Sequence, residues 1–206
     1  MKLFKILFVS MLFFATHISA KKIYVNNNST VGDVFTFSVG LAANNGTTTT
    51  TPKLTLAQGL GIAAVGDTIF IDKGTYNDNT LAFNTASITI IGAGTGNTIF
   101  DNAAGNQRFG VISANNIIFK NFSIVNYYYD PATGQVFMIN ANVTGIKFEN
   151  MVIRKNPGST VGGNGANVYM SSGSSLTINN SVFSCSGWNG NGGGSIYVDN
   201  STLVID

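Results

Sequence analysis

Histidine and cysteine are almost missing from this chain of 206 residues, in which each occurs once. His17 lies in an amino-terminal segment that has the pattern of a removable leader. The mature chain would then have no imidazole for general-base catalysis, for a Ser-His triad or for a zinc site. Cys185 has no second cysteine with which to pair, so an intrachain disulfide is excluded. Stability must therefore come from core burial and hydrogen bonding.

Charged residues are scarce as well, at 10% of the chain. Eleven are basic and nine are acidic, and Lys2 and Lys5 belong to the expected leader, which leaves nine of each sign. A neutral chain with dispersed charges lacks the basic surface that binds nucleic acids or anionic membranes. We therefore expect neither as a partner.

No apolar run reaches the roughly 18 residues that suggest a membrane span. The apolar segment at residues 6–15 follows two lysines and precedes small residues at 19–20, which is the pattern of a secretory signal peptide. We expect residues 1–20 to be removed after Ala20, leaving a secreted chain without a membrane span. A retained anchor or a buried helix is the alternative for this segment.

Glycine, asparagine, serine and threonine dominate instead, as in turn-rich all-β proteins. A unit of three strands is clearest at residues 136–156, where short alternating strands are separated by polar turns. The same pattern recurs along the chain at a spacing of about 29 residues. The position expected to point inward in the second strand of successive units is Ile90, Phe119, Phe148, Ile178 and Ile205, with separations of 29, 29, 30 and 27 residues.

Such a repeat predicts a solenoid, in which each unit buries its apolar face only by stacking on the next. Equivalent strands of successive units must then pair in parallel, about 4.8 Å apart. Asn121, Asn150 and Asn180 follow the second strand in register, and asparagine tolerates the left-handed conformation of a sharp bend. Their amides can also hydrogen-bond along the stack. A β-sandwich, the alternative, would not require this column of asparagines.

The chain before the repeats predicts a cap region, residues 21–66, that opens with a short strand. Residues 26–51 are expected to form an exposed polar loop around one further strand. Apolar residues near helical spacing at 54–64 predict a short amphipathic helix, with Thr51 as its cap and Pro52 in its first turn.

Several segments carry a family resemblance: IYV at 23–25, TLAQGLGIAA after Pro52, GDTIFIDKGTY and SITIIGAGTGNTIFDN. Together they resemble the amino-terminal portion of secreted right-handed parallel β-helix proteins. This is the pectin-lyase-like superfamily, particularly its large bacterial surface members. IRKN at 153–156 and GGGSIY at 192–197 are similar to the FxxN and GGxI repeats of polymorphic outer-membrane proteins, in degenerate form.

The resemblance implies an all-β, right-handed parallel β-helix over residues 21–206, with its coils at 67–206 and a short helix that closes the amino-terminal end of the core. It also implies a location on the bacterial outer membrane or outside the cell. It implies no single activity, because the superfamily includes lyases, hydrolases and non-catalytic adhesins. The sequence ends within a second-strand segment, so we expect the chain to be a fragment or an early-terminated product of a longer protein.

A polysaccharide lyase on this scaffold would need an arginine or lysine base and, as a rule, several acidic residues that hold Ca²⁺ on one outer face. The sequence predicts no such cluster. Lys120 and Glu149 are expected to face each other on adjacent units as an exposed ion pair, which contributes less than about 1 kcal/mol. We therefore assign no catalytic residue, metal ligand or cofactor, with Ca²⁺ expected only if the protein is a lyase.

The first strand of each unit offers a more suggestive surface. Stacked outward tyrosines with amide, hydroxyl and carboxylate neighbours could contact sugar rings. The ordinary preference of aromatic residues for strands is the alternative explanation. The long loop expected at residues 186–194 adds an exposed aromatic side chain, Trp188. The candidate ligand contacts are Met138, Asn140, Tyr169, Ser171, Trp188, Tyr197 and Asp199.

These features favour a non-catalytic, adhesin-like module that presents a long flat face to a polysaccharide or a cell-surface glycan. One alternative is a pectate-lyase-like lyase or hydrolase whose catalytic part is missing or not recognisable in the sequence. A passive structural stalk is the other.

Overall fold

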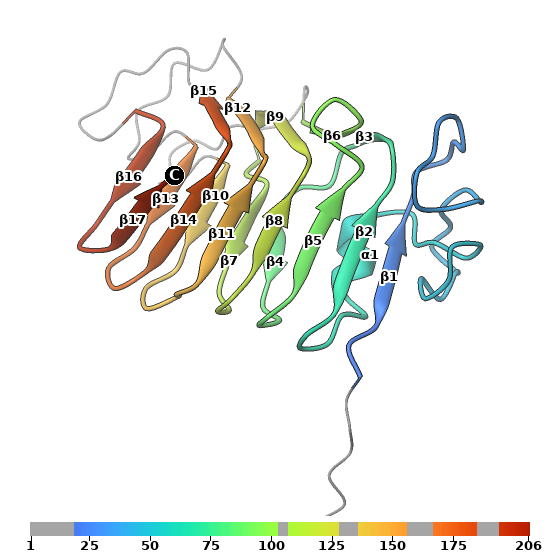
Figure 1. Ribbon diagram of the computed structural model, residues 1–206, viewed down its shortest axis with the longest axis horizontal. Helices are drawn as coiled ribbons and strands as arrows, with labels where there is room; N and C mark the ends of the chain where they lie inside the picture. The colour runs from blue at the N-terminus through green and yellow to red at the C-terminus, as the bar shows by residue number, and fades with distance from the viewer. Residues whose placement is uncertain (1–18, 103–106, 128–135, 156–166, 185–193) are drawn as a thin grey trace, which may run out of the picture.

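The computed structural model describes residues 19–102, 107–127, 136–155, 167–184 and 194–206. In this part of the chain, 17 strands form three sheets that wind around one core, and every strand pair is parallel (Figure 1). Successive coils follow one another along the long axis of the molecule. The all-β, right-handed parallel β-helix predicted from the sequence is confirmed.

Each of the five complete coils contributes one strand to each sheet, and β1 and β17 extend the middle sheet at its two ends. The middle sheet consists, in spatial order, of β1 (Lys22–Val25), β2 (Thr68–Ile71), β5 (Thr89–Gly92), β8 (Ile118–Lys120), β11 (Ile146–Glu149), β14 (Ser175–Asn179) and β17 (Thr202–Ile205). The opening sheet consists of β4 (Leu81–Phe83), β7 (Gly110–Ile112), β10 (Phe137–Ile139), β13 (Val168–Met170) and β16 (Ile196–Val198). The third sheet consists of β3 (Gly74–Tyr76), β6 (Thr98–Asp101), β9 (Ser123–Tyr127), β12 (Val152–Lys155) and β15 (Val182–Ser184).

The core is a set of side-chain columns that run from coil to coil. In the middle sheet, the registers of adjacent strands align Ile69, Ile90, Phe119 and Phe148, all of which are fully buried. Ile205 continues the same column but is 67% exposed, because β17 lies at the edge of the sheet. The alternating pattern of the sequence thus identified the inward positions, and burial is lost only at the last strand.

The asparagine column forms the sharp bend between the middle and third sheets. Asn121, Asn150 and Asn180 have positive φ angles of 61°, 51° and 44°. The side-chain amide of Asn150 donates a hydrogen bond to Oδ1 of Asn121 at 2.9 Å. The predicted left-handed turns are confirmed, and the amide ladder is confirmed between these two coils.

The cap helix, α1 (Leu56–Leu60), begins later than the sequence suggested. The predicted start at Thr51 and Pro52 is wrong, because Lys53 is still extended and pairs with the first strand. Its N–H donates to the carbonyl of Tyr24 at 2.8 Å. The helix is capped by Thr55 instead.

The helix nevertheless closes the amino-terminal end of the core, as expected. Leu56 is fully buried, and Gly59 lies so close to the first coil that a Cβ atom there would be 3.0 Å from Cγ2 of Val25. α1 is the one helix in the described residues, and none of those residues forms a helix long and apolar enough to cross a membrane. The predicted leader lies outside the described residues except for its last two positions.

A buried carboxylate, rather than strand pairing, holds the loop at residues 26–51. The strand predicted within this loop is absent, in a segment that the structure describes throughout. Instead, the carboxylate of Asp72, which is fully buried, accepts the backbone N–H groups of Val34, Phe35 and Thr36 at 2.6, 2.9 and 2.7 Å. Asp72 thus ties three successive backbone groups of the loop to the first coil, in addition to bonds such as that from the N–H of Tyr24 to the carbonyl of Gly46 at 2.7 Å.

A second carboxylate fixes the cap helix. Asp78, between β3 and β4, accepts the backbone N–H groups of Leu56 at 3.3 Å and Ala57 at 2.9 Å, two donors that a helix leaves unpaired in its first turn. Burial raises the pKa of Asp78 above its ordinary value of 3.8, and these hydrogen bonds oppose that shift only in part.

Replacing Asp78 with asparagine is expected to change how stability depends on pH. Because burial places the folded-state pKa above that of the unfolded chain, the folded protein binds more protons between the two values. This residue therefore adds to the free energy of unfolding as the pH falls through the folded-state pKa, and its contribution levels off below 3.8. Urea unfolding gives the free energy of unfolding of both proteins from about pH 7 to about pH 3. As the pH falls, this free energy should shift in favour of the wild type relative to Asp78→Asn. Parallel profiles for the two proteins would contradict this assignment.

Candidate functional site

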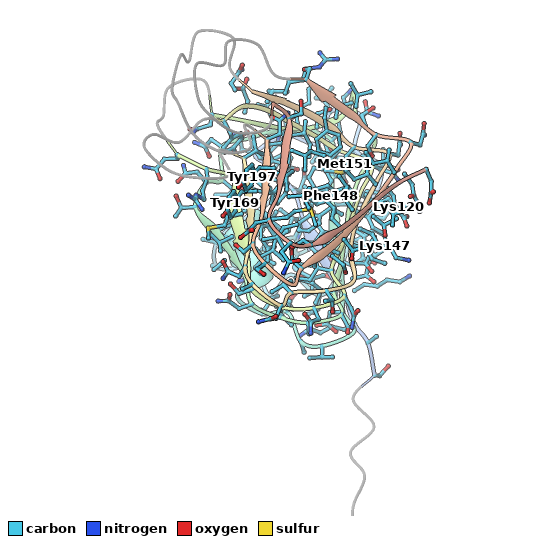
Figure 2. The ribbon with its side chains drawn as sticks, turned by 90° about the vertical axis from the view of Figure 1, so that its left-hand side faces the viewer. Lys120, Lys147, Phe148, Met151, Tyr169 and Tyr197 are labelled. Carbon is cyan, nitrogen blue, oxygen red and sulfur yellow. The ribbon has the colours of Figure 1, made fainter. Side chains whose placement is uncertain are left out.

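The outward face of the opening sheet brings most of the predicted contact residues together. The strand registers align Met138 with Tyr169 and Tyr169 with Tyr197, so these three side chains form one column across three coils. Figure 2 shows the two tyrosines side by side on one side of the helix, with Lys120 and Lys147 on another. We call this surface, formed by β10, β13 and β16, the opening face.

The two tyrosine rings are stacked face to face. Their centroids are 5.0 Å apart and their planes differ by 5°. That distance is too short for coplanar rings lying side by side, so the ring faces cover each other and leave the outer edges of the rings as the part that other groups can approach. Burial, assisted by the negative charge of Asp199, raises the pKa of Tyr169 above its ordinary value of 10.0.

A polar column lies beside the tyrosines. Asn140, Ser171 and Asp199 directly follow the strands, and their N–H groups continue the ladder with bonds of 3.0 Å to the preceding coil. The side-chain amide of Asn140 also donates to Oγ of Ser113 at 2.8 Å. Trp188, the remaining candidate, lies outside the described residues. Six of the seven candidates therefore share one face, and their role as ligand contacts stays a prediction.

The structure adds a basic residue that the sequence did not indicate. Arg108, which precedes β7, donates a hydrogen bond from Nη1 to Sδ of Met138 at 3.1 Å and is only 8% exposed. Sequence reasoning missed it because alternation was followed within strands, and Arg108 lies just outside one. Its position shortly before an opening strand was the available signal. The guanidinium brings a positive charge to the opening face.

The ion pair between Lys120 and Glu149 lies on the middle sheet of the β-helix, and no other ion pair among the residues that the structure describes joins it to form a catalytic cluster. Nζ of Lys120 lies 3.1 Å from Oε2 of Glu149 on the outer face of the middle sheet, and both side chains are partly exposed. This is the exposed pair predicted from the sequence. Within the described residues, no group of three or more acidic, histidine or cysteine side chains could hold a metal ion.

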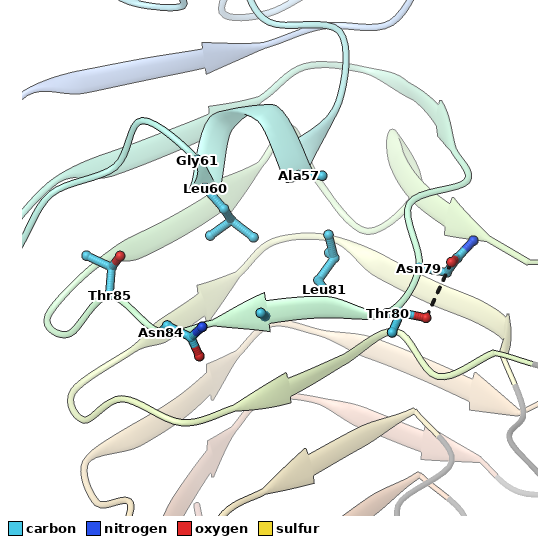
Figure 3. A pocket seen from close by; sticks show the side chains of 9 residues that line it. Ala57, Leu60, Gly61, Asn79, Thr80, Leu81, Asn84 and Thr85 are labelled. Carbon is cyan, nitrogen blue, oxygen red and sulfur yellow. Dashed lines mark hydrogen bonds between the residues drawn. The ribbon is translucent and has the colours of Figure 1, made fainter.

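A hollow of about 360 Å³ lies between α1 and the edge strand β4. Figure 3 shows Leu60 and Leu81 on its walls, with the hydrogen-bonded pair Asn79 and Thr80 at one end. Its lining contains amides, hydroxyls and apolar groups but no ionisable side chain. It offers no acid, base or nucleophile stronger than a threonine hydroxyl.

Comparison with known proteins gives one informative match. No model of a protein family matches the sequence, and no curated protein matches it significantly. A solved structure of a rhamnogalacturonan lyase superposes with a TM-score of 0.57, over 90% of this chain and 51% of its own, with 16% sequence identity. The two structures share the parallel β-helix fold.

At this identity the likeness shows the fold alone. The β-helix described here spans about half the length of the rhamnogalacturonan lyase. The resemblance to β-helix proteins seen in the sequence is therefore confirmed at the level of the fold. The narrower resemblance to polymorphic outer-membrane proteins stays a prediction.

Proposed function

We propose that this β-helix is a secreted or cell-surface module that binds polysaccharide or cell-surface glycan on the opening face. The observation that carries the proposal is the Tyr169–Tyr197 stack, which places two hydroxyl groups beside the polar column that ends at Asp199. Sugars are recognised by such combinations, because their hydroxyl groups need directional hydrogen bonds while their C–H groups pack against apolar and aromatic edges.

Binding without catalysis is favoured by the composition of the face. A lyase reaction needs a base that removes a proton and a group that neutralises the developing negative charge. On the described part of the opening face, Asp199 is an isolated carboxylate, and Arg108 is largely buried against Met138. The module is therefore expected to hold a glycan rather than cleave it.

The binding test compares two double variants. Tyr169→Ala with Tyr197→Ala removes the stack. In affinity electrophoresis, with a polysaccharide that retards the wild type in the gel, we expect the affinity of this variant to be lower by about tenfold or more. The matched control is Tyr24→Ala with Phe70→Ala, which removes another stacked pair, 5.7 Å apart, from the middle sheet. No retention of the wild type by any polysaccharide would favour a passive stalk, and equal losses of affinity in both variants would show that the tyrosine stack is not the binding site.

A polysaccharide lyase is the second candidate, and the likeness to a rhamnogalacturonan lyase favours it. A lyase product is unsaturated and absorbs ultraviolet light, so incubation with pectate or rhamnogalacturonan in the presence of Ca²⁺ separates the two functions. We expect no increase in absorbance. A clear increase that is lost in Arg108→Gln would establish the enzyme and refute the binding module.

A further inference from the structure

The loop at residues 26–51 carries an exposed apolar surface. Figure 1 shows this loop, in shades of blue, projecting beyond β1 at one end of the molecule. Val31 and Phe37 are 79% and 80% exposed, although large apolar side chains are mostly found inside proteins. Three further apolar residues of the same segment are exposed, and we call the whole set the cap-loop patch: Val31, Val34, Phe37, Val39 and Leu41. A cluster of exposed apolar side chains marks a surface that contacts another molecule or a membrane.

The patch lies on a backbone that the fold holds in place. Thr36 and Gly40, which lie between patch residues, are buried, and the carbonyl of Asn26 leaves no room for a side chain at Gly40. The N–H groups of Phe37 and Leu41 donate to backbone carbonyls later in the cap region at 2.9 and 3.2 Å. The exposed side chains are therefore presented by a segment whose inward positions are packed and whose backbone is bonded.

The charges of the cap are divided between its surface and its interior. Residues 21–78 include four lysines and four aspartates. Asp67, Asp72 and Asp78 are buried and Asp33 is half-buried, whereas all four lysines are at least partly exposed. Lys21 pairs with Asp67 at 3.5 Å, and the other three lysines form no ion pair with a described residue. The surface of the cap is therefore cationic, although its acidic and basic residues are equal in number.

Two of these lysines lie beside the cap-loop patch. Nζ of Lys73 is so close to Gly32 that a Cβ atom there would be 2.7 Å from it, which places this ammonium group at the first residues of the patch. Nζ of Lys22 lies 6.0 Å from the ring centroid of Phe70, and Phe35 packs edge-on against the same ring at 5.2 Å. The loop and the two ammonium groups therefore share the outer surface of the first coil.

We propose that the cap-loop patch inserts into the surface of a lipid bilayer that contains anionic phospholipids. Apolar side chains on a surface segment enter the boundary between head groups and acyl chains, and the binding energy grows with the apolar area that is buried. Lysines beside them are attracted to the negatively charged head groups. The neutral net charge of the chain argued against such a membrane, but that sum includes the aspartates that the fold buries. The contact is peripheral and requires no membrane span.

A lipid surface fits the patch better than a second protein does. The patch lies on a projecting loop, which can enter a bilayer without a matching cavity on the other side (Figure 1). A second copy of this chain would bring its own lysines against those of the first, and like charges oppose that contact. The patch belongs to the cap, whereas the opening face is formed by β10, β13 and β16, so the two surfaces are independent.

Vesicle flotation tests the proposal. The protein is used after removal of residues 1–20, because the apolar run of the leader would itself enter lipid, and every described strand follows residue 20. We expect the wild type to float with vesicles of phosphatidylcholine that contain about one third phosphatidylglycerol, and to bind pure phosphatidylcholine at least about tenfold more weakly.

The apolar part of the contact is tested by a double variant. Val31→Ser with Phe37→Ser should lower the partition onto anionic vesicles by about tenfold or more, because two of the most exposed apolar side chains are lost. The matched control is Val65→Ser with Ile205→Ser, which removes two exposed apolar side chains from outside the loop and should bind as the wild type does.

The charged part is tested by Lys22→Gln with Lys73→Gln, which should remove most of the preference for anionic vesicles. Lys147→Gln removes an exposed lysine from β11 and should retain the preference. Tyr169→Ala with Tyr197→Ala should float as the wild type does, so this proposal and glycan binding on the opening face can fail separately.

Insertion itself is read from a tryptophan in the patch. Trp188 is the only tryptophan of the chain, so Phe37→Trp combined with Trp188→Phe gives a single reporter. Its emission should shift to shorter wavelengths with anionic vesicles. An unchanged spectrum in a protein that floats, no flotation of the wild type, or equal flotation of the wild type and the Val31→Ser, Phe37→Ser variant would each overturn the proposal. A wild-type dimer in analytical ultracentrifugation that this double variant does not form would assign the patch to a second copy instead.

Discussion

Replacing Asp72 with alanine is expected to release the loop at residues 26–51 and to lower the free energy of unfolding by about 3 kcal/mol or more. The variant loses the acceptor of four backbone N–H groups, three of them in the loop, and of the Thr36 hydroxyl. Thr36 is only 3% exposed, so water cannot replace the lost acceptor without opening the loop. Urea unfolding should give the loss in stability, and limited proteolysis should show earlier cleavage within the loop.

Asp72→Asn is the graded control for this prediction. An asparagine keeps one acceptor oxygen but introduces an amide that cannot accept, so we expect about half of the effect. Burial raises the pKa of the neighbouring Asp33, and the charge of Asp72 adds to the shift, so removing that charge gives back a small part of the lost stability. Full stability of Asp72→Ala together with unchanged proteolysis would show that the loop is held by other contacts.

Replacing Phe148 with alanine is expected to lower the free energy of unfolding by about 3–5 kcal/mol. Its ring is fully buried and contacts rings of neighbouring coils, with centroid distances of 5.3 Å to Phe119 and 5.0 Å to Phe137. The cavity would lie in the centre of the stack, where the backbone of three sheets prevents collapse. Denaturant unfolding, followed by far-ultraviolet circular dichroism, measures the loss in free energy.

Phe148→Leu retains most of the volume and should cost about 1–1.5 kcal/mol. The comparison separates the cavity from a general sensitivity of this coil. A loss below about 1 kcal/mol in Phe148→Ala would mean that the adjacent coils move together to fill the space. In that case the aromatic column would be less rigid than the edge-to-face contacts suggest.

The coils after Phe109 could be predicted because each repeats the same combination of alternating strands and a left-handed asparagine. The first coil lacks that combination. Ile69 and Ile90 are adjacent in the core column but only 21 residues apart in the sequence, and no asparagine marks their turn. β3 and β4, with three residues each, therefore do not stand out in the sequence.

The cap could be predicted only in outline, because its contacts are distant in sequence. Asp72 bonds to backbone groups 36–38 residues earlier, and Asp78 to groups 21–22 residues earlier. Neither carboxylate interrupts a local pattern in a way that reveals its partner. Local spacing indicated that a helix exists near residue 58, but its start was decided by the pairing of Lys53 with the first strand.

The opening face followed from strand register, which a period-two pattern gives directly. The face-to-face stacking of Tyr169 and Tyr197 did not, because alternation fixes the side of the sheet and leaves the ring orientation open. Arg108 and Arg154 show the same limit. Both are single basic residues in the sequence, and only the folded chain places one against Met138 and the other at the rim of a hollow on the outer face of the third sheet.

Because the strands of successive coils pair in register, a whole coil can be removed or added without disturbing the pairing of the coils on either side. Joining Asn121 directly to Met151, through loss of the 29 residues between them, would leave an asparagine at the bend, connect β8 to β12 and bring Phe119 next to Ile178. Such a change shortens the molecule and preserves the phase of every column. Genes for this architecture can therefore gain or lose length by recombination in whole coils, while smaller insertions are confined to the bends.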